Sequence, residues 1–289
     1  MNVHVVSKSD PSVEQEYVDQ VNRAIAIGVS DGFRVAVDGE GVNLGRKGTL
    51  EILSVCFEVD KDTVFLVDFQ KTSKADLAVR KTKELLECEE VVKIIHDCRM
   101  DCDVLYQHYE ITMKNVHDTQ CFHKHIYFSE KLSNLNDTLA INDIPINVVR
   151  DSDVYKQNPR FWATRPVTDK MKRWASGDVN KLFQLADMQL NQISRHQLEH
   201  AKEESRSFTK LLVDMETATV ECLIPIGRFI GRGGKNIRSV EKRTGCFMYQ
   251  DRPLEKSTFR MNAAFIVYYP SRSSLTRVEE EMGHHKDAW

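Results

Sequence analysis

The residues best suited to chemistry in this sequence are carboxylates. Asp38 and Glu40 are separated by one residue in the stretch Val-Ala-Val-Asp-Gly-Glu-Gly at 35–41. The alternating valines are typical of a β-strand and predict that the strand ends where the acids appear. Gly39 and Gly41 leave room for another group to approach closely. Two carboxylates so placed can bind a hard divalent cation through oxygen, although a turn with two solvated acids fits the same pattern.

Two further acids lie beside expected helices. Asp101 comes just past an apolar run at 91–96, where a helix is expected to begin. Asp178 lies within an amphipathic helix and borders its apolar face, where a carboxylate is costly unless it is paired or metal-bound. Four converging carboxylates need cations, so the sequence predicts two Mg²⁺ or Mn²⁺ ions roughly 4 Å apart. Such a pair of ions suits the hydrolysis of a phosphodiester.

The elements that must position these acids are an alternation of strands and helices. Asp10 and Pro11 begin the first helix, as a capping acid and a proline at the first helical position, and Gly28 is expected to end it. Three early strands followed by strand–helix alternation favour a mixed sheet covered by helices. We expect strands at 3–6, 35–38, 52–58, 63–69, 91–96 and near 116, a turn at 60–62, and helices at 11–28, 75–88, 101–109, in pieces over 119–142, and from 168 past 192.

The order of the acidic motifs resembles a known family. Asp-x-Glu at 38–40, His-x4-Asp at 96–101 and aromatic-x3-Asp at 174–178 are similar to the DEDD 3′-to-5′ exonucleases of the ribonuclease D type. The resemblance covers roughly residues 1–195 and is strongest to the subgroup of Egalitarian and exonuclease 3′-5′ domain-containing proteins. The stretches that carry this similarity are His-Asp-Cys-Arg at 96–99, Leu-Tyr at 105–106, His-Asp-Thr-Gln at 117–120, Phe-Trp at 161–162 and Arg-Pro at 165–166.

The resemblance implies a ribonuclease H-like mixed sheet and a role for each acid. Asp38 would bridge both metal ions, and Asp101 would serve the second ion. Glu40 and Asp178 would serve the ion beside the attacking water. The family normally has Tyr or His where this chain has Trp174, to hold or deprotonate that water. Indole has an N–H donor and no acceptor, so Trp174 cannot take a proton, and catalysis would depend on the metal ions alone.

A second resemblance lies toward the C-terminal end. The loop Gly-Arg-Gly-Gly at 231–234 separates two short expected helices and presents backbone N–H groups to an anion. It is not a Walker loop, because the Gly-Lys-Ser/Thr ending is missing. With strands expected at 217–225, 247–250 and 264–269 and a helix at 273–282, the segment resembles a type I K-homology (KH) domain with its GXXG loop. The family clamps about four single-stranded nucleotides over that loop.

Local charge agrees with nucleic-acid binding. Between 226 and 260, nine basic and three acidic residues give a local charge of +6, whereas the whole chain carries −3. Phosphate contacts of this kind position a strand but read little sequence. The expected RNA-binding residues are Arg228, Gly231, Arg232, Gly233, Gly234, Lys235 and Arg238.

Length and composition set the domain organisation. The 289 residues are enough for a large and a small domain. We expect an exonuclease-like domain at 1–195, a charged helical linker at 196–212, a KH domain at 213–283 and a tail at 284–289. No run is long enough to span a bilayer and no signal pattern begins the chain, so we expect a cytoplasmic or nuclear protein that is not secreted. Seven scattered cysteines are expected to be reduced.

Three weaker patterns leave alternatives open. Cys98-x3-Cys102, with several histidines nearby, fits either a zinc site or buried thiols. Trp162 with Arg165 fits either stacking on a 3′-terminal base or packing. Asp118 is interpreted as structural, a helix cap or hydrogen-bond acceptor.

The favoured hypothesis is a metal-dependent 3′-5′ exonuclease that acts on single-stranded RNA held by the KH domain, with a preference over DNA left open. Protein partners in an RNA-processing or RNA-silencing complex are expected but not specified. The alternative is an RNA-binding adaptor that retains the exonuclease fold and cleaves weakly or not at all.

Overall fold

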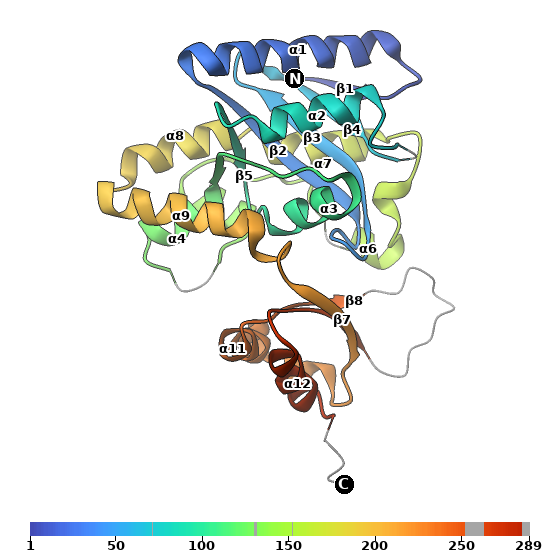
Figure 1. The fold of residues 1–289 in the computed structure, drawn as a ribbon, viewed down its shortest axis with the longest axis vertical. Coiled ribbons are helices and arrows are strands. Elements are labelled where there is room, and N and C mark those ends of the chain that lie inside the picture. Colours follow the sequence, from blue (N-terminus) through green and yellow to red (C-terminus); the bar gives the residue numbers. More distant parts are fainter. Residues whose placement is uncertain (71, 130–131, 152, 252–262, 285–289) are drawn as a thin grey trace. The chain divides into compact units, whose positions relative to one another are not determined.

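The computed structural model describes residues 1–70, 72–129, 132–151, 153–251 and 263–284. The chain divides into two compact units, Met1–Lys210 and Leu211–Trp289 (Figure 1). Within the described residues, no helix combines the length and the apolar character that crossing a membrane would require.

The first unit is built on a six-stranded mixed sheet in the order β1-β4-β3-β2-β5-β6. β3 runs antiparallel to both β2 and β4, whereas β1 is parallel to β4, β5 to β2, and β6 to β5. This sheet and its flanking helices confirm the expected ribonuclease H-like fold. The strands are β1 (Asn2–Val6), β2 (Phe33–Val42), β3 (Thr49–Phe57), β4 (Asp60–Asp68), β5 (Val91–Ile95) and β6 (Val116–Asp118).

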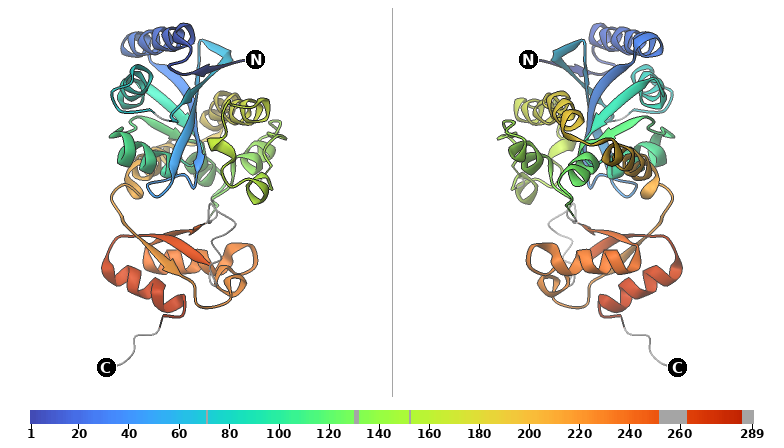
Figure 2. Two further views of the ribbon diagram at one scale, coloured as in Figure 1. Left: turned by 90° about the vertical axis from the view of Figure 1, so that its right-hand side faces the viewer. Right: turned by 90° about the vertical axis from the view of Figure 1, so that its left-hand side faces the viewer.

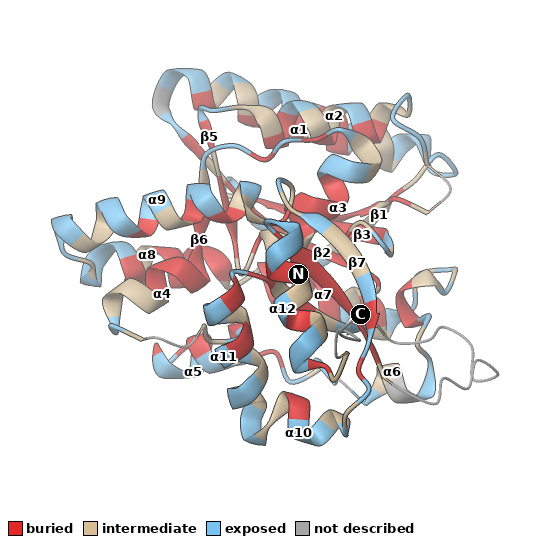
Figure 3. Cartoon of the chain, turned by 60° about the horizontal axis from the view of Figure 1, so that its bottom comes forward, coloured by how far each residue is buried: buried red, intermediate tan, exposed pale blue. Residues whose placement is uncertain are grey.

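Helices cover both faces of this sheet. In Figure 2, α1, α2 and α3 lie on one side of the strands and α7 and α8 on the other. Figure 3 shows the strands and the inward helix surfaces buried, with the outer surfaces of α1 and α9 exposed. The helices are α1 (Pro11–Asp31), α2 (Leu77–Glu87), α3 (Arg99–Tyr109), α4 (Thr119–Ile126), α5 (Leu135–Ile141), α6 (Val154–Gln157), the 3₁₀ turn η1 (Phe161–Ala163), α7 (Asp169–Val179), α8 (Leu182–Gln192) and α9 (Arg195–Leu211).

The strand that carries the first two acids does not end at them. β2 continues to Val42 because β3 pairs with it along its length, Asp38 opposite Ser54 and Glu40 opposite Ile52. On its other side, β5 pairs with β2 only as far as Ala36. The expectation of a strand ending at Asp38 is therefore wrong. The open space beside the acids arises because the parallel neighbour stops, while β2 itself goes on.

Three other expectations about element ends are also wrong. Gly28 lies inside α1, where an added Cβ would meet Val91 Cγ2 at 3.0 Å, and the helix is capped by Gly32 instead. The helix expected from 168 past 192 is two helices, α7 and α8, separated at 180–181. β4 already begins at Asp60, so the turn lies before the expected 60–62.

The second unit has the element order of a type I KH domain. Its three antiparallel strands lie in the order β7-β9-β8, and its helices follow in the βααββα sequence. A core of aliphatic and aromatic side chains, among them Phe229 and Phe265, joins the sheet to the helices. The elements are β7 (Glu216–Glu221), α10 (Ile226–Ile230), η2 (Arg232–Gly234), α11 (Lys235–Thr244), β8 (Phe247–Asp251), β9 (Ala264–Tyr269) and α12 (Arg272–Glu281).

The segment between the expected domains is helical. Residues 195–211 form α9, and the division into compact units falls at its end, after Lys210. The domain limits given above stay predictions. Of the expected tail at 284–289, residues 285–289 lie outside the described residues.

Candidate functional site

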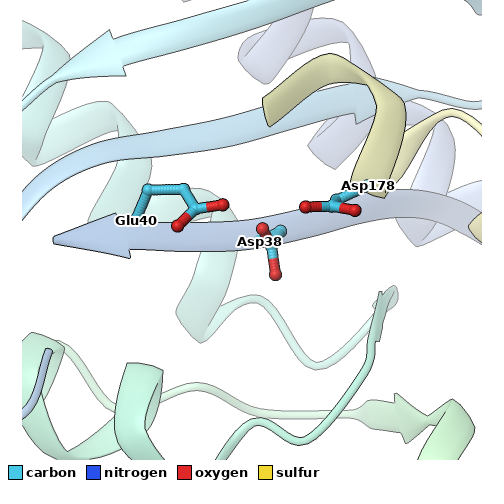
Figure 4. Close-up of side chains that lie close together, drawn as sticks. All are labelled: Asp38, Glu40 and Asp178. Carbon is cyan, nitrogen blue, oxygen red and sulfur yellow. The ribbon is translucent and has the colours of Figure 1, made fainter. Parts of the chain in front are cut away.

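Three of the expected acids meet at one place. Carboxylate oxygens of Asp38, Glu40 and Asp178 all lie within 4.8 Å of one another. Asp38 and Glu40 share one side of β2, two residues apart, and Asp178 reaches them from α7 (Figure 4). Residues 140 positions apart in sequence thus point their oxygens toward a common centre.

The fourth acid, Asp101, lies beside the same strand. A Cβ added at Gly39 would lie 2.2 Å from Asp101 Oδ1, so the carboxylate rests against the glycine between the other two acids. Burial raises the pKa of both Asp101 and Glu40, and the negative charge of Asp38 adds to the shift of each. The glycine at 39 therefore supplies the close approach that the sequence suggested.

The electrostatics of this acidic cluster, defined as Asp38, Glu40, Asp101 and Asp178, are unfavourable without a cation. Burial raises the pKa of Asp38 to about 8, and the neighbouring Asp178 carboxylate adds to the shift. Burial first, and then the negative charges of other cluster members, raise the pKa of Glu40 and Asp101 well above the usual range. Burial likewise raises the pKa of Asp178, against the attraction of Arg150.

The donor atoms of the cluster fit a hard divalent cation. Three buried oxygens of the cluster have no hydrogen-bond partner among the described residues: Glu40 Oε1, Asp101 Oδ1 and Asp178 Oδ2. Buried carboxylate oxygens left without donors are costly, whereas Mg²⁺ and Mn²⁺ prefer such ligands. The cluster could therefore hold a metal ion of this class.

Two residues at the cluster were not expected from the sequence. Asn147 donates from Nδ2 to Asp178 Oδ1 at 3.0 Å and to the Trp174 carbonyl at 3.0 Å. Arg150 Nη1 lies 3.6 Å from the same Asp178 oxygen. Neither belongs to a motif with recognisable spacing, so only the fold brings them to the site. One oxygen of Asp178 is thus held by these neighbours, and the other remains directed at the cluster.

Trp174 lies beside the cluster and is almost fully buried. Its indole N–H is near enough to Asp178 to lower the pKa of that acid, but it does not reach hydrogen-bond geometry with any described residue. Its ring lies edge-on to Tyr155, with ring centroids 6.0 Å apart. The Tyr155 hydroxyl accepts a hydrogen bond from Trp162 Nε1 at 2.9 Å, and its own pKa is raised first by burial and then by the charge of Glu40. A hydroxyl is thus present near the acids, from a position the sequence did not indicate.

The two alternatives for Trp162 and Arg165 are resolved by packing. Trp162 has no exposed surface. Arg165 donates to both oxygens of Asp68, at 2.8 and 2.6 Å, and to the Trp162 carbonyl at 2.7 Å. Arg165 therefore holds the segment before α7 against β4, Trp162 packs on Phe161 and Trp174, and neither side chain is free to stack on a base.

Cys98, Cys102 and Asp118, near the start of α3, have structural roles. Cys98 and Cys102 are buried, and a hydrogen bond to Cys102 raises the pKa of Cys98. The Asp118 carboxylate accepts from the backbone N–H groups of Asp97, Cys98 and Gln120, at 3.0, 2.8 and 2.9 Å. Asp118 thus joins the start of α4 to the turn that precedes Asp101.

The GXXG loop of the second unit has the backbone that its glycines permit. Gly231, Gly233 and Gly234 have φ angles of 72°, 57° and 76°, a region that residues with a Cβ rarely adopt. A Cβ at Gly231 would lie 2.6 Å from Asn236 Cγ, and Asn236 Nδ2 donates to the Arg228 carbonyl at 2.8 Å. At Gly233 no atom lies within 4 Å of such a Cβ, so the tip of the loop is open to a ligand.

Basic side chains surround this loop. Arg228 lies in α10 before the loop, and Arg232 lies in the loop itself. Lys235 and Arg238 lie in the first two turns of α11. Three of the nine basic residues counted in the sequence, Arg252, Lys256 and Arg260, lie outside the described residues.

Comparison with known proteins agrees with the fold. The model of the 3′-5′ exonuclease family matches residues 15–194, and the KH domain model matches residues 219–261. The chain belongs to the 3′-5′ exonuclease family, with a ribonuclease D-type domain followed by a KH domain.

The curated relatives are distant homologues. The silkworm (Bombyx mori) piRNA biogenesis protein EXD1 is 30% identical over 107 residues, 36% of this chain and 33% of the relative. The Egalitarian protein homolog of Caenorhabditis elegans is 31% identical over 99 residues, 31% of this chain and 17% of the relative. The mouse (Mus musculus) EXD1 is 27% identical over 205 residues, 63% of this chain and 35% of the relative. The matches thus span about a third or less of each relative's length.

Solved structures support the fold. The Trypanosoma brucei RNase D complex with RNA U12 has a TM-score of 0.56 at 20% identity, over 72% of this chain and 70% of that one. Brucella melitensis NrnC with bound Mg²⁺ has a TM-score of 0.50 at 19% identity, over 62% of this chain and 83% of that one.

Proposed function

We propose that this protein is a metal-dependent 3′-5′ exoribonuclease that hydrolyses single-stranded RNA. The observation that carries the proposal is the meeting of Asp38, Glu40 and Asp178 within 4.8 Å, with buried oxygens that lack partners. The Mg²⁺ in a structural relative and the RNA in another support the choice of ion and of substrate.

Asp38, Glu40, Asp101 and Asp178 would hold two Mg²⁺ or Mn²⁺ ions. When bound, such ions activate water and neutralise the charge that develops on the leaving oxygen. The neighbours hold these ligands in place, because the Asn147 amide fixes Asp178 and Gly39 lets Asp101 come close. The oxygens of the cluster become available to cations once their protons leave, since their pKa values are raised.

The KH unit would hold the strand by its phosphates. The open tip at Gly233 and the cations of Arg232 and Lys235 suit a single-stranded backbone. Shared similarity to piRNA biogenesis proteins supports an RNA rather than a DNA substrate and protein partners in an RNA-silencing complex.

Labelled RNA tests the proposal. A single-stranded RNA labelled at its 5′ end is incubated with the full chain and Mg²⁺ or Mn²⁺. We expect progressive shortening from the 3′ end, lost in Asp38→Asn and in Asp178→Asn. Asp169→Asn is the matched control, because Asp169 lies in the first turn of the same helix as Asp178 but is exposed and outside the cluster. RNA that stays intact with both ions, or that is cut equally by the cluster variants, would reject the proposal.

A second function, an RNA-binding adaptor, is favoured by two observations. Trp174 has no acceptor for a proton, and Arg150 lies close enough to Asp178 to offset part of the charge of the cluster. In the same assay an adaptor binds the labelled RNA without shortening it. Mobility-shift measurements on the wild type and on Asp38→Asn then give equal affinity.

A further inference from the structure

A second group of metal-binding side chains lies on the outer surface of the first unit. His196, His200 and Glu204 repeat at intervals of four on α9, so they share one face of the helix. His125, from the last turn of α4, faces the same stretch. None of these residues belongs to the acidic cluster or to the KH unit.

The two histidines of α9 direct the same ring nitrogen at each other. His196 Nε2 and His200 Nε2 lie 3.2 Å apart, with the rings nearly perpendicular at 86°. Two nitrogens that bind one tetrahedral Zn²⁺ at about 2.0–2.1 Å are about 3.3 Å apart. The pair therefore already has the spacing of two ligands of one ion, although both side chains are exposed and could turn to water instead.

The third side chain lies next to them. The His125 and His200 rings are stacked, with centroids 6.1 Å apart and an angle of 18°. His125 Nε2 now lies 2.8 Å from Glu204 Oε2, while the other oxygen of Glu204 is paired with Lys124. The half-buried His125 side chain must rotate away from Glu204 to bring its nitrogen to the pair.

We propose that His196, His200 and His125 form a binding site for Zn²⁺ on the surface of the exonuclease domain. Imidazole nitrogens select zinc over magnesium, which prefers oxygen ligands. Glu204 lies one turn beyond His200 and would serve as the fourth ligand after it releases Lys124 and His125. The ion would join α9, the last helix of the first unit, to α4, which Asp118 caps. The site is independent of the exonuclease activity proposed above.

Zinc titration of a variant without the acidic cluster tests this site. In Asp38→Asn/Asp178→Asn, two of the acids that could also take Zn²⁺ are neutral, so calorimetry reports the histidines. We expect one Zn²⁺ per chain and a rise in thermal stability on binding. Co²⁺ in place of Zn²⁺ should give the visible absorption of tetrahedral nitrogen and oxygen ligation.

Single substitutions in that background assign the ligands. His200→Ala should weaken Zn²⁺ binding by more than about a hundredfold, and His125→Ala by at least about tenfold. His4→Ala is the matched control, because His4 forms a similar imidazole–carboxylate pair, with Glu16 at 3.0 Å, without a second histidine. Circular dichroism checks that each variant is folded. A parent that binds no Zn²⁺, or a His200→Ala or His125→Ala variant that binds it as tightly as the parent, would overturn the three-histidine site.

Discussion

In the proposed reaction, the side chain at position 174 decides whether a protein group can hold the attacking water beside the acidic cluster. Trp174 is buried, and its N–H finds no acceptor of good geometry among the described residues. A tyrosine in the same place could both donate to and accept from a water molecule. The Tyr155 ring packs edge-on against Trp174, and its hydroxyl is held by Trp162 Nε1.

We predict that Trp174→Tyr increases RNA cleavage. A positioned acid–base group contributes about a hundredfold or more in favourable cases, so a gain of at least about tenfold in the rate is expected. Single-turnover kinetics on the labelled RNA measure it. Trp174→Phe is the control, because it removes the indole without adding a hydroxyl. Equal rates for the Tyr and Phe variants would mean that the missing hydroxyl does not limit the reaction.

A second prediction for a single residue concerns Gly39. An added methyl group would lie 2.2 Å from Asp101 Oδ1, so Gly39→Ala must push that carboxylate out of the cluster. We expect loss of Mg²⁺ binding and of cleavage, with a loss of folding stability of about 1–3 kcal/mol from overpacking. Calorimetry with Mg²⁺ and urea unfolding measure the two effects.

Gly227→Ala is the control for this substitution, because no atom lies within 4 Å of a Cβ at that position. Normal Mg²⁺ affinity in Gly39→Ala would show that Asp101 does not depend on this close approach.

At the scale of elements, Asp118 holds the start of α4 and the turn before α3 together. Its carboxylate accepts from three backbone N–H groups, two of them at 97–98 and one at Gln120. These bonds fix the turn after β5 that carries Asp101 to the cluster.

We predict that Asp118→Ala lowers the free energy of unfolding by about 3 kcal/mol, because two buried backbone donors and one partly buried donor lose their acceptor, at about 1–3 kcal/mol for each buried one. Asp10→Ala is the control, since Asp10 caps α1 with a single bond to Val13 N at 3.2 Å in an exposed place. That cap should contribute about 1 kcal/mol. Urea unfolding of both variants compares them, and equal losses would contradict the structural role given to Asp118.

The GXXG loop is the element on which RNA affinity depends in the proposed function. Gly233→Asp adds a negative charge at the open tip of the loop, so we expect at least about a tenfold weaker affinity for single-stranded RNA. Gly245→Asp is the matched control: Gly245 has a similar φ of 70°, is exposed, and lies at the other end of α11. Fluorescence anisotropy with labelled single-stranded RNA measures the affinity of both variants. Affinity that is unchanged in Gly233→Asp would remove the loop from the RNA site.

At the scale of the whole molecule, the acidic cluster links folding to pH and to metal ions. Burial raises the pKa of Asp38 from its usual value near 4 to about 8. Between these two values the folded chain binds more protons than the unfolded one, so the contribution of this group to stability falls as pH rises. The raised pKa values of Glu40 and Asp101 act in the same direction.

We therefore predict that Mg²⁺ stabilises the protein more at about pH 8 than at about pH 5, because cations bind the deprotonated carboxylates and release their protons. The Tm with saturating Mg²⁺ or with EDTA, followed across this range, measures the effect. In Asp38→Asn/Asp178→Asn the difference in Tm between Mg²⁺ and EDTA should largely vanish at every pH. If the rise in Tm on adding Mg²⁺ were independent of pH, the cluster would not titrate as its burial implies.

Local patterns predicted the mixed sheet and the first helix, because apolar periodicity reflects which side of an element is buried and because Asp10 with Pro11 marks a helix start. The KH unit was inferred from the resemblance that the GXXG loop and its flanking residues carry. The four acids were recognised as a set from the resemblance of their order and spacing to the exonuclease family, since Asp-x-Glu alone also fits a solvated turn.

The surroundings of those acids could not be predicted from local patterns. Asn147, Arg150 and Tyr155 reach the cluster from a segment without regular periodicity, and Arg165 is committed to Asp68 on a distant strand. The ends of β2 and α1 were misjudged because pairing with β3 and packing on β5 extend them past their local stop signals. Such contacts join residues far apart in the chain, and their free energy exists only once the sheet has formed, so no local pattern encodes them.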